Sequence, residues 1–196
     1  MEFAAAPILG FALRVTNAPA SEVIHTVVLR CQVQLDVTRR RYTADEAAQL
    51  RDLFGEPERW SNTLRSMLWT HTSVIVPSFE GETTVEVPVP CTFDLNVAAT
   101  KYFYGLREGE VPLTFLFSGS VFYEDPSGGL RVVPVPWDRE ARFRLPVSTW
   151  RGLIDHYYPN IAWLALRRDV FDRLYRFKVE RGIPTWEQAV EEATGI

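Results

Sequence analysis

The strongest constraint on the fold is a strict alternation of side-chain character between residues 27 and 37. The apolar positions are Val27, Leu29, Cys31, Val33, Leu35 and Val37, and they alternate with Val28, Arg30, Gln32, Gln34 and Asp36. A repeat of two residues is typical of a β-strand with one buried face and one face in water. We therefore predict a strand over residues 22–37, with Cys31 as a buried thiol on its apolar face.

The rest of the chain reads as strands first and helices afterwards. Strands are predicted at 7–15, 64–76, 83–87, 92–97, 113–123, 130–135 and 142–145. Helices are predicted at 43–54, which begins with a Thr43–Glu46 capping box, and at 98–106, 147–157, 161–181 and 185–193. This order predicts the α+β class, as a curved antiparallel β-sheet followed by a C-terminal layer of about three helices. With 196 residues, one domain is expected, mainly β over 1–145 and helical over 146–196.

Composition excludes several classes of protein. The hydrophobic fraction of 46% excludes disorder for most of the chain, and the net charge of −4 argues against binding to nucleic acid. No run approaches the roughly 20 apolar residues of a membrane span. The N-terminal apolar stretch has no basic residue ahead of it, so no secretory signal is expected. We expect a cytoplasmic protein in which Cys31 and Cys91 are both reduced.

No catalytic motif stands out in the sequence. It has no HExxH, CxxC or GxSxG pattern and no glycine-rich phosphate loop. No catalytic residue, metal ligand or cofactor is therefore predicted. If the fold leaves a pocket between sheet and helices, the residues to inspect in it are His71, Cys91, Asp155 and His156.

Arginine and tryptophan side chains are the candidates for contact with another protein. Arg39, Arg40 and Arg41 follow the alternating strand, where such charges are usually solvated but can contact an acidic partner. Six tryptophans are many for this length, and aromatic residues are enriched in interfaces. The candidate protein-binding residues are Arg39, Arg40, Arg41, Trp137 and Trp163.

Three blocks in the second half carry a family resemblance. They begin VPVPCTFDLNVAAT (residues 87–123), VPVPWDREARFRL (133–159) and LRRDVFDRLYRFKVE (166–190). In this order they resemble an uncharacterised actinobacterial family, a domain of unknown function whose genes often lie beside nickel-iron hydrogenase subunit and maturation genes. The resemblance covers residues 79–190 and, more loosely, the first strands. It implies an accessory or maturation role around a hydrogenase and brings no catalytic residues.

A second resemblance is to the SecB-type export chaperones. The segments YYPNIAWLALRR (157–168) and ERGIP (180–184) are similar to the opening and exit of the long helix of those proteins. This resemblance implies a curved sheet followed by two helices and a holdase activity toward unfolded chains.

We therefore expect a non-enzymatic accessory protein that assists the assembly, maturation or function of a nickel-iron hydrogenase by binding another protein. Two alternatives stay open, a SecB-like holdase chaperone and a small-ligand-binding protein or enzyme with a pocket between sheet and helices. Neither nucleic acid nor a membrane is an expected partner, and self-association into a homo-oligomer stays open.

Overall fold

The computed structural model describes residues 5–93, 97–125 and 127–195. By its internal contacts the chain divides into two compact units, Met1–Asn160 and Ile161–Ile196. The strands are β1 (Ile8–Thr16), β2 (Val23–Leu35), β3 (Met67–Val76), β4 (Phe79–Glu80), β5 (Glu82–Pro90), β6 (Glu110–Glu124), β7 (Leu130–Pro134) and β8 (Glu140–Pro146). The α-helices are α1 (Ala44–Gln49), α2 (Arg51–Phe54), α3 (Trp60–Thr63), α4 (Val97–Gly105), α5 (Val147–Tyr157), α6 (Arg168–Glu180) and α7 (Trp186–Thr194).

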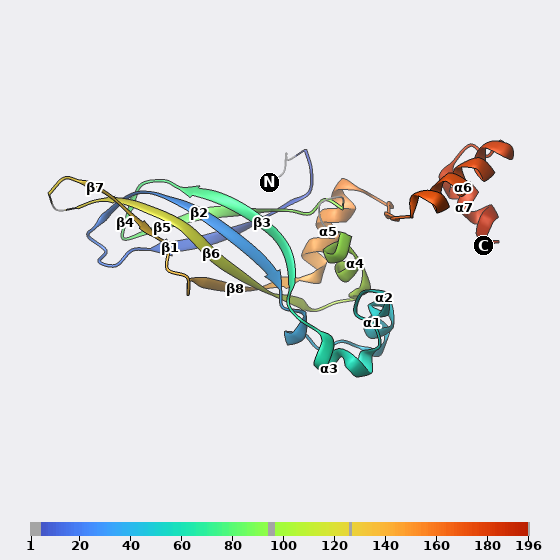
Figure 1. Cartoon of the computed structure of the whole chain (residues 1–196), viewed down its shortest axis with the longest axis horizontal. Coiled ribbons are helices and arrows are strands. Elements are labelled where there is room, and N and C mark those ends of the chain that lie inside the picture. The colour runs from blue at the N-terminus through green and yellow to red at the C-terminus, as the bar shows by residue number, and fades with distance from the viewer. Residues whose placement is uncertain (1–4, 94–96, 126, 196) are drawn as a thin grey trace. The chain divides into compact units, whose positions relative to one another are not determined.

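The first unit contains two antiparallel sheets. The larger has the order β3-β2-β6-β7, with β4 also pairing with β2 and β8 also pairing with β6, and the smaller consists of β1 and β5. Figure 1 shows β2, β3 and β6 as long neighbouring strands, with helices α1–α5 gathered at one end of the sheets. The mixed helix and strand content and the antiparallel pairing that the sequence predicts are confirmed.

Strand β2 follows the predicted alternation almost to its end. Side chains from Val27 to Leu35 at every second position are buried, and those between them are exposed or half-buried. The prediction is wrong for Asp36, which was placed on the wet face. The residue is only 6% exposed, and its carboxylate accepts hydrogen bonds from the Ser66 and Thr114 hydroxyls at 3.1 and 2.6 Å. The strand ends at Leu35, and Val37 begins a short 3₁₀ helix.

The core of the first unit lies between the two sheets. Ile24, Val27, Leu29 and Val76 of the larger sheet form a buried cluster against Leu13, Val15 and Val85 of the smaller one. The Phe11 ring also meets the Phe115 ring edge-on, at 5.0 Å between centroids. These contacts bury one face of the larger sheet and leave the middle of the other without a covering layer.

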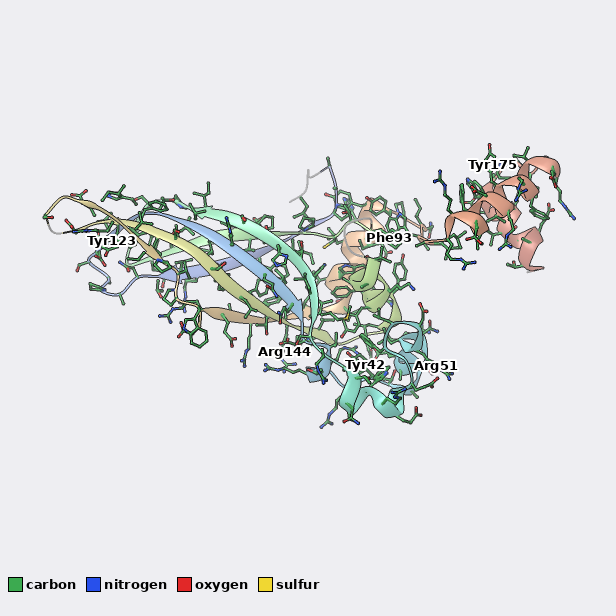
Figure 2. The ribbon with its side chains drawn as sticks, in the orientation of Figure 1. Tyr42, Arg51, Phe93, Tyr123, Arg144 and Tyr175 are labelled. Carbon is green, nitrogen blue, oxygen red and sulfur yellow. The ribbon has the colours of Figure 1, made fainter. Side chains whose placement is uncertain are left out.

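Aromatic side chains hold the helical end of the first unit together. Tyr102 and Phe103 of α4 are fully buried, and the Phe103 ring stacks on Trp150 of α5 at 4.8 Å. Figure 2 shows Tyr42 at this end and Tyr123 at the opposite end of the sheet. The Tyr42 and Tyr102 hydroxyls lie within 3.0 Å of each other, which satisfies both polar ends inside the cluster.

One predicted strand is wrong. Residues 92–97 were expected to be extended, but Thr92 and Phe93 lie outside any strand and Val97 already belongs to α4, while residues 94–96 lie outside the described residues. The pairing of β5 with β1 explains why the strand ends at Pro90. Ile8 is opposite Pro90, and among the described residues the last backbone bond between these segments runs from the Cys91 N–H to the Pro7 carbonyl, so Thr92 and Phe93 lie beyond this pairing.

The second unit is a helical hairpin formed by α6 and α7. The predicted helix over 161–181 is wrong in its first turns, because α6 begins only at Arg168. Residues 161–166 are all apolar and therefore have no polar face, whereas the amphipathic pattern of a surface helix begins at Arg168. Helix α7 begins as predicted, with the Thr185 hydroxyl accepting from the Gln188 N–H. Ile183 and Ala189 are the buried residues between the helices.

Candidate functional site

Arg40, one of the three candidate arginines, is engaged inside the fold. Its guanidinium donates two hydrogen bonds, at 2.9 and 2.8 Å, to the carboxylate of Glu46, and the two side chains are only 8% and 2% exposed. It also donates to the Glu108 and Glu110 carbonyls at the start of β6. The expectation of three solvated charges is therefore wrong for Arg40, whereas Arg39 and Arg41 are exposed.

The capping box of α1 explains why Glu46 is available as the partner. The Thr43 hydroxyl accepts from the Glu46 N–H, and the Glu46 carboxylate accepts from the Thr43 N–H, as the sequence predicts. The same carboxylate accepts from the backbone N–H of Arg107 at 2.8 Å. Burial opposes the charged form, but the bonds from Arg40, Arg107 and Thr43 outweigh it and lower the pKa of Glu46 to about 2. This network joins α1 to the segment before β6 and is structural.

The four pocket candidates do not share one cavity. Cys91 is buried at the end of β5, and burial raises the pKa of its thiol to about 12, so it is a poor nucleophile. Asp155 and His156 lie exposed on α5, where the His156 ring packs edge-on against Tyr157 at 5.2 Å. His71 is on the exposed face of β3 and lines a hollow of about 310 Å³ whose other walls come from β2 and β6.

That hollow lies on the open face of the larger sheet. It is lined by three consecutive residues from each of β2, β3 and β6, and by no residue of a helix or of the smaller sheet. The expectation of a pocket between sheet and helices therefore does not describe this cavity. The sequence assigned no role to Arg30, Ser73 and Ser118, which line it. The alternation along β2 and β3 indicates that Arg30 and Ser73 are on the exposed face, but only the strand register shows that they are neighbours.

Trp137 has the most exposed large apolar side chain of the described residues, at 94% of its full area. It lies in the connection between β7 and β8, where Pro134 and Pro136 have no N–H with which to continue the ladder along β6. The connection is nevertheless held in place. The Val135 N–H donates to the Gly119 carbonyl, the Phe117 N–H donates to the Arg139 carbonyl, and the Arg139 N–H closes the turn onto the Pro136 carbonyl.

The second unit carries its own aromatic cluster. The rings of Phe171, Tyr175 and Trp186 lie 5.3 to 6.3 Å apart, and each is about half exposed. Lys178 donates to the Ile183 and Pro184 carbonyls and so fixes the turn between the helices. Trp163, the remaining candidate, lies half-buried in the irregular segment before α6.

Within the described ranges, no three side chains among His, Cys, Asp and Glu gather closely enough to hold a metal ion. In the same part of the chain, every helix is too short or too polar to cross a membrane. In the first unit, the Trp137 turn and the hollow on the open sheet face are accessible surfaces for binding.

Comparison with known proteins places the chain in a family without assigning it an activity. Neither the curated proteins nor the solved structures contain a match. One family model matches residues 1–194, which is nearly the whole chain. The protein belongs to a family of unknown function, DUF6084.

Proposed function

We propose that this protein is a non-enzymatic accessory protein that binds another protein, with the indole of Trp137 as the anchor of the contact. The supporting observation is a large apolar side chain that is 94% exposed on a turn fixed by three backbone hydrogen bonds. Among the residues that the structure describes, none accepts a hydrogen bond from its indole N–H. Nothing in the folding of the first unit therefore requires a tryptophan at this position.

The energetics of binding favour such a residue. An aromatic side chain of this size can bury about 150–250 Å², which at about 25 cal/mol per Å² amounts to roughly 4–6 kcal/mol before costs. One of these costs is the ordering of a mobile loop on binding. Here the Gly119 and Phe117 backbone groups of β6 already hold the turn, so that cost is small. Tryptophan is among the residues most enriched at the energetic centres of interfaces.

The geometry defines the chemistry of the partner. An indole needs an apolar pocket with a hydrogen-bond acceptor for its N–H. The adjacent Asp138 and Arg139 are exposed and only loosely paired, at 4.0 Å, so they suit a polar rim around that pocket. The family resemblance supports a nickel-iron hydrogenase subunit or maturation factor as the protein that provides it.

Binding to purified hydrogenase components tests the proposal. The large subunit, the small subunit and the maturation factors are each titrated against the immobilised protein by biolayer interferometry. Trp137→Ala should weaken binding to one of them by about 30-fold or more, as expected for a central aromatic anchor. Leu130→Ala is the matched control, since Leu130 is also an exposed apolar residue of this region, on β7. Absence of binding to every component, or equal loss in both variants, contradicts the proposal.

A holdase function is the second candidate, and exposed apolar residues on the open sheet face favour it. Ile75 is 73% exposed, and Val28 directly opposite it on β2 is also exposed. Unfolded chains bind to such apolar surface. The purified protein at a stoichiometric ratio should then suppress the aggregation of a denatured test enzyme, and Ile75→Ser should suppress it less. No suppression by the wild-type protein removes this candidate.

A further inference from the structure

The hollow on the open face of the larger sheet has a defined arrangement of side chains. Strand register sets it, because residues directly opposite on neighbouring strands point to the same face. Arg30 on β2 is opposite Ser73 on β3 and Ser118 on β6. In the next row on this face, Gln32 is opposite His71 and Leu116. The six side chains around the hollow are therefore Arg30, Gln32, His71, Ser73, Leu116 and Ser118.

Arg30 is the permanent charge of this site, and its guanidinium has no hydrogen-bond or ion-pair partner in the described part of the chain. The Ser73 and Ser118 side-chain hydroxyls are likewise without a partner there. Neighbouring strands lie about 4.8 Å apart, so one hydroxyl flanks the arginine on each side. The Arg30 guanidinium and the Ser73 and Ser118 hydroxyls therefore lie in one row across three strands, and none of them bonds to another described residue.

No carboxylate competes for these donors inside the hollow, because none of its lining residues is acidic. The next residue of the Gln32 row is Glu140 on β8, opposite Leu116. Its carboxylate already accepts from the Arg142 guanidinium at 2.7 Å. Arg30 is therefore the one permanently charged side chain that lines the hollow, and the Ser73 and Ser118 hydroxyls and the Gln32 amide are further donors around it.

We propose that this hollow binds an anionic group, a carboxylate or a phosphate, with Arg30 as its counter-charge and the Ser73 and Ser118 hydroxyls as flanking donors. Arginine binds both groups through paired N–H donors, and charge-assisted hydrogen bonds are stronger than neutral ones. Gln32 and His71 add polar contacts at one side, and Leu116 supplies an apolar wall. A volume of about 310 Å³ is at the lower end for ligand sites and suits a small organic acid or a small phosphate ester.

Titration calorimetry with two probes tests this site and distinguishes the two sources of the anion. Succinate represents the carboxylates and inorganic phosphate the phosphates, each titrated into the full-length protein at constant ionic strength. Saturable binding of at least one probe is expected, and Arg30→Gln should weaken it by about tenfold or more. Arg59→Gln is the matched control, because Arg59 is also an exposed arginine but lies on a short helix away from the sheet face.

The outcomes are distinct. Loss of binding in Arg30→Gln with no change in Arg59→Gln supports the site, and the preferred probe gives the class of anion. No saturable binding of either probe, or equal weakening by both substitutions, overturns it. The Trp137→Ala variant should bind the anion as the wild type does, so this test is independent of the proposed protein contact.

Discussion

Replacement of Arg40 by methionine tests whether the Arg40–Glu46 network is part of the fold or part of a binding surface. The Glu46 carboxylate is 2% exposed and receives two hydrogen bonds from Arg40, one from the Arg107 N–H and one from the Thr43 N–H. Methionine has a similar length, but it removes half of these bonds and the compensating charge. A buried carboxylate without its counter-charge lowers the free energy of unfolding by about 3–5 kcal/mol.

Urea unfolding measures this loss, with tryptophan emission as the readout, since Trp69 and Trp150 are buried in the first unit. With a denaturant slope of about 2 kcal/mol per M, the midpoint of Arg40→Met should fall by roughly 1.5–2.5 M. The control is Arg51→Met, because Arg51 pairs with Glu56 at the surface, where the two side chains are 63% and 50% exposed. That substitution should cost less than about 1 kcal/mol.

A double substitution completes the test. Arg40→Met with Glu46→Leu removes both charges and should recover part of the stability lost by Arg40→Met alone, because no unpaired carboxylate stays buried. If Arg40→Met lowers the midpoint no more than Arg51→Met does, Arg40 is not a structural residue. It would then return to the set of binding candidates with Arg39 and Arg41.

Three further predictions concern the first unit. The pKa of Glu46 is lowered from 4.5 to about 2, so its ionisation should add about 3 kcal/mol to the free energy of unfolding above pH 5, and this contribution is lost as the pH falls toward 2. The free energy of unfolding, measured as a function of pH, should show this loss in the wild type and not in Glu46→Gln. Gly119→Ala should cost at least about 2 kcal/mol in urea unfolding, because φ is +140° there and an added Cβ would lie 2.0 Å from the Val28 carbonyl oxygen. Burial raises the pKa of Cys31 and of Cys91 to about 12, so both thiols should react with a chromogenic disulfide at pH 8 only after unfolding; rapid reaction of the native protein would show that a thiol is accessible.

The local features of this fold could be predicted from sequence, and the long-range contacts could not. The alternation along β2 determines which residues are buried, and the Thr43–Glu46 pair determines where α1 begins. Both signals lie within one element. Besides capping α1, the Glu46 carboxylate accepts a hydrogen bond from the Arg107 N–H, 61 residues away, and no local pattern indicates that contact.

The same distinction applies to the candidate sites. Arg30 is visibly on the polar face of its strand, but its position between Ser73 and Ser118 requires the register of three strands that are far apart in sequence. Trp137 was a candidate because of its residue type. Its exposure depends on the path of the connection between β7 and β8, which the backbone bonds of Val135 and Arg139 to β6 hold in place.

Site-specific photocrosslinking from position 138, beside the intact Trp137, is the most direct test of the proposed protein contact. A photoreactive phenylalanine analogue replaces the exposed Asp138 in the native host, and a second strain carries it at Leu130 as the control. Irradiation should join position 138, and not position 130, to one defined hydrogenase subunit or maturation factor, identified by mass spectrometry of the adduct, and Trp137→Ala should abolish this adduct. No adduct from position 138, the same adducts from both positions, or an adduct that persists in Trp137→Ala would contradict the role of Trp137 as the anchor of a specific contact.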